Sequence, residues 1–300
     1  MARFVTVTPN PALDLTLEVE RLHVGGVNVA SLSRFDSGGK GANVARMLAQ
    51  LGGDVTAVVA LPSDGGGSWI TGFPRTIDLR TTRVNATLRA NVAITSEDGV
   101  TTKVNMRGGP INQSEGEALL NAIAGAARGG AWVIVGGSLP TGMDATWIRR
   151  AVEVSHASGA RIAVDCSGEA LRVAVESGAD LVKPNGEEAA AVVGFDVVDQ
   201  TSAGRAALEL TNLGAKSVLL SLGEHGAVYL EKGGRVPVQT GARKAVVRST
   251  VGAGDVLLAS FLYALTEGAD PTAALRSAVA WAAAKVQQPG TAMPTEPLTD

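Results

Sequence analysis

The sequence predicts an α/β protein with a mostly parallel central sheet and helices on both faces. From about residue 113 onward, short apolar runs of strand length alternate with longer runs of helix length. The 37 glycines are dispersed between these runs, as many tight strand-to-helix turns require. With 45% hydrophobic residues, 300 residues can bury one large core. We therefore expect a single domain over 1–300.

The first strand is expected at 3–8, and Pro9 and Pro11 predict a loop that leaves Asp14 at the exit of this strand. Alternating apolar and polar residues then predict half-exposed strands. These are 15–22 and 27–32, followed much later by a hairpin of 91–94 and 101–105 around Glu97-Asp98-Gly99. We expect these strands, inserted from about 15–35 and 89–106, to form a small β-sheet that covers a site as a lid.

A helix is predicted to open at Asp36 and to continue to Leu51, where Gly52-Gly53 ends it. A buried strand should follow at 55–60. Residues 62–82 contain Gly65-Gly66-Gly67 and Pro74, so no element is predicted there.

The regular alternation begins after Gln113. Helices are predicted at 114–127, 144–156, 169–176, 187–193, 201–213, 255–265 and 272–286. Strands are predicted at 131–135, 161–165, 180–183 and 217–222, with a hairpin-like pair at 227–230 and 235–239.

The composition argues against several classes of partner. The net charge is -3 without a long basic run, and aromatic residues make up 4%, so we expect neither nucleic acid nor a membrane as partner. The single cysteine, Cys166, is interpreted as a small core residue, and the three histidines lack the spacing of metal ligands. No signal segment or apolar span is evident, so a cytoplasmic protein is expected.

The stretch Ser249-Thr250-Val251-Gly252-Ala253-Gly254-Asp255 leads from a loop into an apolar run of helix length. The N–H groups of a first helical turn bind anions, and glycines let the backbone approach a phosphate closely. A carboxylate beside such a cradle is typical of the base in phosphoryl transfer. The alternative is a glycine-rich loop before a core helix, with Asp255 as an ordinary first-turn acid.

Two common nucleotide motifs are absent. Lys40 is followed by Gly41 rather than Ser or Thr, so Gly38-Gly39-Lys40-Gly41 is no Walker A loop. Leu257 stands where a dinucleotide fingerprint has its third glycine.

Two segments about 210 residues apart carry a family resemblance. Gly38-Gly39-Lys40-Gly41-Ala42-Asn43-Val44-Ala45 resembles the first signature of the ribokinase-like (PfkB) carbohydrate kinases, and Ser249–Asp255 resembles the second. The order and the intervening elements extend the resemblance over nearly the whole chain. Thr8-Pro9-Asn10-Pro11-Ala12-Leu13-Asp14 and Gly137-Ser138-Leu139-Pro140 are similar to the branch that phosphorylates sugar phosphates. Its members include 1-phosphofructokinase, tagatose-6-phosphate kinase and the minor 6-phosphofructokinase.

The resemblance implies a ribokinase-like fold and roles for individual residues. Asp255 matches the catalytic base, and the N–H groups of Gly252, Ala253 and Gly254 match an anion hole. The positions that match substrate-binding residues are Asp14, Gly38, Gly39, Lys40, Asn43, Arg89 and Ser138. Arg89 would meet the phosphate already on the sugar, although Leu88 replaces the usual threonine before it. Arg83, Lys40 and Lys103 are alternative anchors.

The resemblance also implies an ATP site with Mg²⁺. Asn185 and Glu188 match a motif that organises the metal, with Glu188 acting through water. The other positions that match nucleotide-binding residues are Lys183, Ser221, Gly223 and Gly226, where the two glycines would leave room for the nucleotide.

Structural interpretations of the same residues stay open. Asn185 and Glu188 could be a capping pair of a helix. Ser221 and the glycines after it could form a plain turn, and Gly38-Gly39 could be only a turn before a core helix. Asp165 is interpreted as structural, or as supporting other site residues.

We expect a sugar-phosphate kinase that converts fructose 1-phosphate and ATP to fructose 1,6-bisphosphate, with tagatose 6-phosphate and fructose 6-phosphate as alternative acceptors. A protein that binds sugar phosphate or nucleotide without turnover is the alternative of another class, and Asp255 argues against it. A homodimer through the lid sheet is expected.

Overall fold

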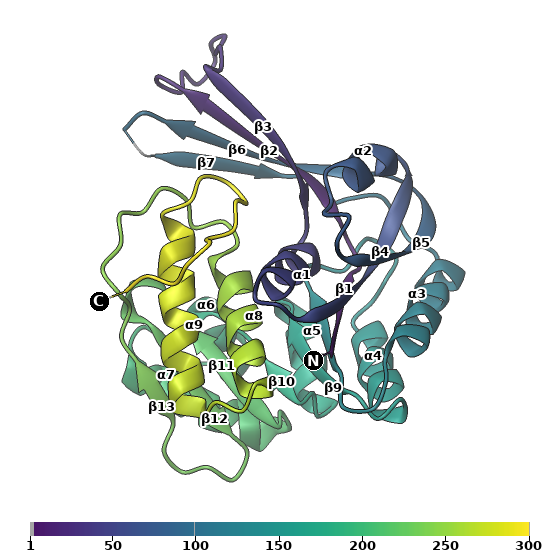
Figure 1. The fold of residues 1–300 in the computed structure, drawn as a ribbon, viewed down its shortest axis with the longest axis vertical. Coiled ribbons are helices and arrows are strands. Elements are labelled where there is room, and N and C mark those ends of the chain that lie inside the picture. Colours follow the sequence, from purple (N-terminus) through teal and green to yellow (C-terminus); the bar gives the residue numbers. More distant parts are fainter. Residues whose placement is uncertain (1–2, 99, 300) are drawn as a thin grey trace.

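The computed structural model describes residues 3–98 and 100–299. Within these residues, the chain forms a nine-stranded sheet, helices on both of its faces, and a separate four-stranded sheet (Figure 1). The predicted class, α/β with a small additional sheet, is confirmed. Gly99, which belongs to the predicted hairpin turn, lies outside the described residues.

The large sheet has the order β13-β12-β11-β10-β9-β8-β1-β4-β5. Neighbouring strands from β11 to β5 pair in parallel, whereas β12 and β13 are antiparallel. The strands are β1 (Arg3–Thr8), β4 (Asp54–Asp64), β5 (Asp78–Thr87), β8 (Trp132–Gly136), β9 (Arg161–Asp165), β10 (Leu181–Val182), β11 (Ser217–Ser221), β12 (Ala227–Glu231) and β13 (Val238–Thr240).

Two apolar clusters, one on each face, hold the helices against this sheet. Alternate residues of β8 supply both clusters, because successive side chains of a strand point to opposite faces. One face carries α3 (Gln113–Ala126), α4 (Thr146–Ala157), α5 (Gly168–Glu176), α6 (Gly186–Val193) and α7 (Gln200–Leu213). The other carries α1 (Lys40–Gln50), α2 (Gly66–Thr71), α8 (Ala253–Thr266) and α9 (Pro271–Val286). Cys166 is buried, as expected.

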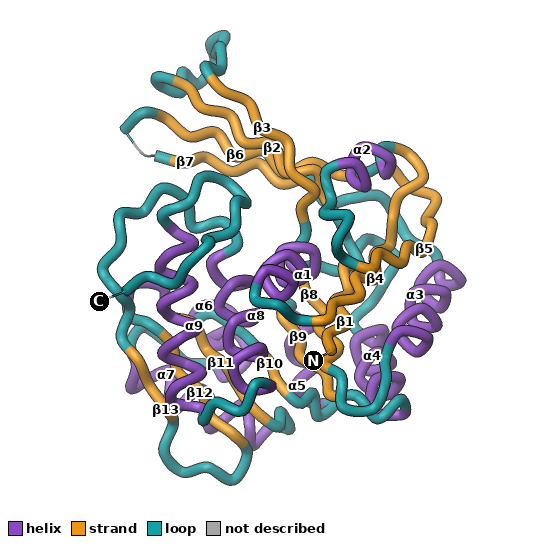
Figure 2. The backbone as a smooth tube through the Cα atoms, in the orientation of Figure 1, coloured by secondary structure: helices purple, strands orange, loops and turns teal. Residues whose placement is uncertain are grey.

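The small sheet has the order β3-β2-β6-β7 and stands apart from the body of the molecule (Figure 2). Its strands are β2 (Ala12–Val19), β3 (Leu32–Gly38), β6 (Arg89–Ser96) and β7 (Thr101–Asn105). The predicted hairpin corresponds to β6 and β7, which pair antiparallel.

The strand predicted at 27–32 is wrong. Residues 20–31 form turns and irregular backbone, and Val27 and Val29 are 93% and 85% exposed, so their spacing reflects no buried face. The returning strand is β3, which begins at Leu32 and pairs antiparallel with β2. Residues 36–38 belong to it, so the helix predicted to open at Asp36 begins at Lys40.

Two further segments differ from the expectation. The segment predicted as a loop after the first strand becomes β2 from Ala12 onward, because Pro11 lies just before the pairing begins. Residues 62–82, for which no element is predicted, contain the end of β4, helix α2 and the start of β5. Pro62 is accommodated where the β4–β5 register shifts, between Pro62 and Asp64.

Among the described residues, no helix combines the length and the apolar character needed to span a bilayer.

Candidate active site

The candidate site lies where the carboxyl ends of several parallel strands meet. Asp165 ends β9, Lys183 directly follows β10, and Ser221 ends β11. The N-termini of α1 and α8 reach the same edge, since Asn43 of α1 bonds to Asp255 of α8. Loops at this edge are where open α/β sheets bind ligands.

The first turn of α8 is built as an anion site. Gly252 is the N-cap residue with a φ of 78°, a left-handed conformation that favours glycine. The helix starts at Ala253, and the N–H groups of its first turn have no partners within the helix. One of them, the Ala253 N–H, makes a long bond of 3.4 Å to the Thr250 carbonyl oxygen before the helix. A Cβ at Gly254 would lie 3.2 Å from the Lys183 Nζ, so this backbone runs beside an ammonium group. The turn thus combines amide donors with a positive charge.

Asp255 sits in this first turn with 5% of its surface exposed. Its Oδ2 accepts a hydrogen bond of 2.7 Å from the Asn43 Nδ2. Burial raises the pKa of Asp255 to about 6, and the nearby Asp165 carboxylate adds to the rise. Lys40, the Asn43 amide and Lys183 oppose it. A carboxyl group with this pKa can accept a proton near neutral pH.

Asp165 lies between two lysines. Its Oδ1 accepts from the Lys40 Nζ at 2.7 Å, and its Oδ2 lies 3.1 Å from the Lys183 Nζ. Burial pushes the pKa of Asp165 up, but the two ammonium groups outweigh this effect and keep it below its ordinary value. The same carboxylate keeps the pKa of Lys40 above its ordinary value despite burial, so Lys40 stays charged. Asp165 thereby fixes two cations beside the turn of α8.

Asp14 and the glycines before α1 form another part of the site. A Cβ at Gly38 would lie 2.2 Å from the Asp14 Cγ, so only glycine admits the carboxylate here. Asp14 Oδ1 accepts from the Asn91 Nδ2 at 2.8 Å. Gly39 caps α1 with a φ of 127°. Burial raises the pKa of Asp14, although Asn91 and Arg89 counteract it.

Arg89 lies at the junction between the small sheet and the body. Its Nε and one terminal nitrogen donate to the Asn10 carbonyl oxygen at 3.2 and 3.1 Å. The other terminal nitrogen donates to the Asn91 Oδ1 and to the Met106 carbonyl. Of the five N–H groups of a guanidinium, four are thus used within the protein, and Arg89 helps to hold the small sheet in place.

Of the other residues considered for the acceptor, Ser138 lies next to Arg89, whereas Lys103 and Arg83 lie on other strands. Ser138 Oγ accepts from the Asn10 Nδ2 at 3.1 Å, next to Arg89. Lys103 shares a face of the small sheet with Asp14, because alternate residues along paired strands point the same way. Arg83 lies on β5, the edge strand of the large sheet.

A cavity of about 720 Å³ opens between the α8 turn and the β12–β13 side of the sheet. It is bordered by Asn185, Ser221, Gly223 and Gly226 from the predicted nucleotide residues, and by Ala253 and Gly254. Apolar side chains of α8 and α9 form its other wall: Leu257, Val279, Ala282, Ala283 and Val286. This arrangement suits a flat base with phosphates directed at the anion site.

Some of the predicted nucleotide-binding residues also have the purely structural roles considered from the sequence, in a helix cap or a turn. Asn185 and Glu188 form a capping box, with bonds of 2.8 and 2.9 Å, so they do open α6. A Cβ at Gly226 would lie 2.0 Å from the Thr240 carbonyl oxygen, so this glycine is required by the turn itself. Around Gly223, in contrast, no atom lies within 4 Å of a Cβ position.

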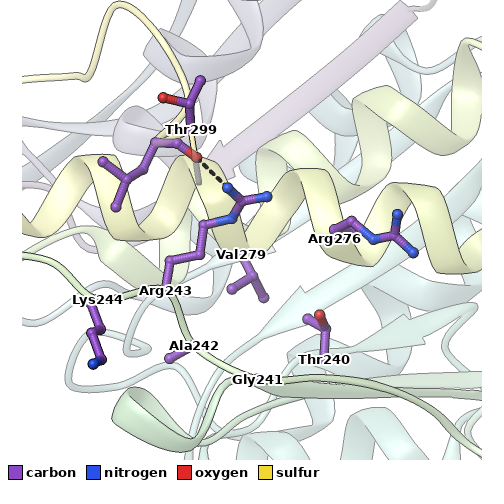
Figure 3. A pocket seen from close by; sticks show the side chains of 9 residues that line it. Thr240, Gly241, Ala242, Arg243, Lys244, Arg276, Val279 and Thr299 are labelled. Carbon is purple, nitrogen blue, oxygen red and sulfur yellow. Dashed lines mark hydrogen bonds between the residues drawn. The ribbon is translucent and has the colours of Figure 1, made fainter.

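A second cavity, of about 460 Å³, adjoins the first and shares Ala242, Arg243, Lys244 and Val279 with it. Figure 3 shows the guanidinium of Arg243 directed at the Leu298 carbonyl, to which it donates at 2.8 Å. Lys244 and Arg276 extend to opposite sides in the same view. The basic side chains therefore do not converge on one point.

The acidic residues at this edge fit a metal ion that keeps most of its water. In the part of the chain that the structure describes, no cluster of three or more His, Cys, Asp or Glu side chains could enclose an ion. Glu188 lies within electrostatic reach of Lys40, since its carboxylate helps to raise the pKa of Lys40. Mg²⁺ commonly binds through one or two carboxylates together with substrate phosphates.

Residues 10–297 match the family model described as "pfkB family carbohydrate kinase". The chain belongs to the pfkB family of carbohydrate kinases. The predicted family and the predicted kinase activity are therefore confirmed.

Relatives within the pfkB family align over nearly the full length. The 1-phosphofructokinase of Rhodobacter capsulatus is 34% identical over 299 residues, which cover 97% of this chain and 93% of the relative. The ATP-dependent 6-phosphofructokinase isozyme 2 of Escherichia coli is 31% identical, with 97% and 94% covered. The crystal structure of phosphofructokinase-2 from Escherichia coli in complex with potassium matches with a TM-score of 0.90 at 30% identity, over 98% and 95% of the two chains.

The sequence does not fully predict the roles of two residues of this pfkB-family site. Asp165 is interpreted from sequence as structural or as supporting other site residues, and the structure shows which residues it supports, Lys40 and Lys183. Arg46 is not considered at all, yet it donates to the Asn43 Oδ1 at 2.9 Å and to the Ser37 carbonyl. Its position three residues after Asn43 on one helix is the signal that could have found it.

Proposed function

We propose that this carbohydrate kinase transfers the γ-phosphoryl group of ATP to a ketohexose that already carries a phosphate, and that fructose 1-phosphate is the acceptor. The observation that carries the proposal is the buried Asp255 carboxylate, with a pKa of about 6, in the first turn of an anion-binding helix.

In the proposed reaction, Asp255 takes the proton of the acceptor hydroxyl as its oxygen attacks the γ-phosphorus. The bond between that phosphorus and the β–γ bridging oxygen breaks, and ADP leaves with the electron pair. The hydrogen bond from Asn43 holds the carboxylate oxygen in one orientation. Burial keeps water from competing for the proton.

The negative charge of the transferring group would meet the N–H groups of Gly252, Ala253 and Gly254. Lys183 lies beside Gly254, and Lys40 is held by Asp165, so two ammonium groups flank the turn. Such fixed donors stabilise the transition state without reorganising during the reaction. ATP would occupy the cavity of about 720 Å³, with Asn185, Ser221 and Gly223 on its border.

Mg²⁺, when bound, neutralises charge on the phosphate oxygens and orients them for transfer. Glu188 would hold it through water, while continuing to cap α6. The proposed metal role and the capping role are therefore compatible.

On the acceptor side, Asp14, Asn43 and the backbone at Gly38 and Gly39 would bind the sugar hydroxyls, because a polyol needs both acceptors and donors. Arg89 is the proposed anchor for the existing phosphate, together with Ser138. One N–H of Arg89 remains after its four bonds within the protein.

The choice of fructose 1-phosphate draws support from the relatives. Both 1-phosphofructokinases and 6-phosphofructokinase isozymes align over nearly the whole chain. Ser249-Thr250-Val251 and Gly137-Ser138-Leu139-Pro140 are similar to the 1-phosphofructokinase subgroup. Because the reaction consumes ATP, we infer the cytoplasm as its compartment.

The test is a comparison of kcat/KM with ATP and four acceptors: fructose 1-phosphate, fructose 6-phosphate, tagatose 6-phosphate and unphosphorylated fructose. We expect fructose 1-phosphate to give the highest value and fructose the lowest. A higher kcat/KM for fructose 6-phosphate or tagatose 6-phosphate would make that sugar phosphate the acceptor in place of fructose 1-phosphate. Tight binding without turnover of any acceptor would instead support a binding protein.

We further propose a homodimer that pairs the small sheets. A row of apolar residues crosses all four strands at paired positions: Phe35, Leu15, Val92 and Val104. Phe35 and Val104 are 61% and 57% exposed. Asp14 and Asn91 point to the opposite, site-facing side, because successive residues alternate. An exposed apolar sheet face of this kind suits a second copy of the chain.

A further inference from the structure

Lys285 is a buried cation that the proposed mechanism does not use. It lies in the last turn of α9 and has no exposed surface. It is one of the largest fully buried side chains. Lysine is almost never fully buried unless its charge is compensated. An apolar side chain of similar length could fill the same space, so the charge itself calls for an explanation.

The side chain connects two segments of the site edge. Its Nζ donates to the Gly290 carbonyl oxygen at 2.8 Å. A Cβ added at Gly252, the residue that caps the anion-binding helix, would lie 3.4 Å from the Lys285 Cε. Lys285 therefore packs against Gly252, on the side of this residue that Asn43 and Asp255 also approach.

The backbone on either side joins the same segments. Arg248 N and Ser249 N both donate to the Val286 carbonyl, at 2.7 and 3.1 Å. The loop that leads into the anion turn is thus tied to the end of α9, one residue after Lys285. A Cβ at Gly290 would lie 3.0 Å from the Thr16 Oγ1, so the small sheet also borders this junction.

The charges around Lys285 come from several elements. Burial lowers its pKa to about 8, while the Asp255 carboxylate opposes this and Arg34 of β3 adds to it. Asp36, also on β3, favours the charged form. The ammonium is thus paired electrostatically with the proposed base itself.

We infer that Lys285 is a positioning residue, which fixes the Gly252 turn and so aims the anion-hole amides at the transferring phosphoryl group. This inference rests on the proposed phosphoryl transfer. Lys285 acts through the Gly252 turn, against which its Cε packs. Because its bond to the Gly290 carbonyl fixes the Lys285 side chain against Gly252, the amides keep their direction when the negative charge develops.

The test uses two variants. Lys285→Met keeps the length of the side chain but removes its charge and its donors. We expect kcat to fall roughly 10- to 100-fold, less than the roughly 10²–10³-fold loss from removing a direct donor to an oxyanion, while KM for the sugar phosphate changes less than about threefold. Lys285→Ala leaves a cavity at the position of the ammonium, and ammonium or methylammonium chloride should restore part of its kcat, whereas equal sodium chloride should not.

Arg276→Met is the matched control, since it removes an exposed cation from the same helix and should leave kcat unchanged. Thermal unfolding of each variant separates positioning from simple stability. Wild-type kcat in Lys285→Met would overturn the inference. So would a loss of kcat that follows a lowered melting temperature and is not restored by ammonium. A wild-type enzyme without turnover would contradict the proposed function instead.

Discussion

At the scale of single residues, opposing influences set the pKa of Asp255, the proposed base. Burial and the neighbouring Asp165 favour its protonated form, while Lys40, Asn43 and Lys183 favour the carboxylate. Without the cations the pKa of Asp255 would be higher still, and less of the carboxylate form would be available to act as a base. With Asn43 on one oxygen, the carboxylate keeps a fixed direction. The balance leaves the pKa near 6, in a range useful for general base catalysis.

This balance predicts how activity depends on pH. A base must be deprotonated, so kcat/KM should fall as the pH drops below about 6. The acceptor's own phosphate titrates in the same range. The informative quantity is therefore the shift of the acid limb of kcat/KM between the wild type and a variant. In Asn43→Ala the hydrogen bond that lowers the pKa of Asp255 is lost, and the acid limb should move to higher pH. An identical limb in both proteins would show that another group controls it.

Arg89 gives a prediction about the existing phosphate of the acceptor. Arg89→Ala should raise KM for fructose 1-phosphate by about tenfold or more, since bonds to charged groups contribute roughly 1.5–3 kcal/mol, while KM for ATP changes little. Steady-state kinetics with each substrate varied in turn would measure this.

Lys103→Ala is the matched comparison, because Lys103 lies on the same sheet face as Asp14. A larger effect of Lys103→Ala on the sugar KM would assign the anchor to Lys103. Thermal unfolding should accompany both variants, since Arg89 also bonds to the Asn10 and Met106 carbonyls.

At the scale of elements, the junction of β3 and α1 predicts a sharp glycine requirement. Gly38→Ala would place a Cβ within 2.2 Å of the Asp14 Cγ, so the Asp14 carboxylate must move. We expect KM for the sugar phosphate to rise about tenfold or more, with a smaller effect on ATP. Gly125→Ala in α3 is the control, because nothing lies within 4 Å of its Cβ position. An equal KM for the sugar phosphate in the two variants would show that Asp14 does not bind the acceptor.

The helices could be predicted from sequence because their boundaries are marked locally. Asp270 caps α9 with Pro271 in its first turn, and Asp199 caps α7. The strand β3 could not be predicted, because the pairing of Leu32–Gly38 with β2 decides it, and Val27 and Val29 showed a misleading alternation. Long-range pairing overrides local pattern here.

The candidate site was predictable to a similar degree. Glycine-rich turns with Asp255 and Asn43 are visible in the sequence because their spacing is local. The bond between Asn43 and Asp255 is not, since 212 residues separate the two. The pairing of Asp165 with Lys40 and the burial of Lys285 likewise depend on the tertiary fold.

At the scale of the whole molecule, the apolar row on the small sheet predicts the oligomeric state. The wild type should sediment as a dimer at micromolar concentration. Phe35→Asp should sediment as a monomer, because it places a charge on the exposed apolar face that the proposed dimer would bury. Val27→Asp is the control, since Val27 is exposed in the turn region outside the strands. A monomeric wild type, or an unchanged dimer in Phe35→Asp, would contradict this interface.

The whole molecule also brings the two halves of the reaction together. Asn43, one of the residues proposed for the acceptor, bonds to Asp255, and the cavity proposed for ATP borders Ala253 and Gly254 of the same helical turn. Phosphoryl transfer requires both substrates at this carboxylate, whereas binding alone does not. The carboxylate is therefore the point at which an enzyme and a binding protein differ.

The most direct measurement is the product formed from fructose 1-phosphate and ATP by the wild type and by Asp255→Asn, followed by phosphorus NMR, with ATP binding measured in parallel by calorimetry. We predict fructose 1,6-bisphosphate and ADP from the wild type. Asp255→Asn should bind ATP with nearly unchanged affinity and form product at least about 10³-fold more slowly. Bisphosphate formed by the variant at a rate close to that of the wild type, or no product from the wild type, would contradict the account.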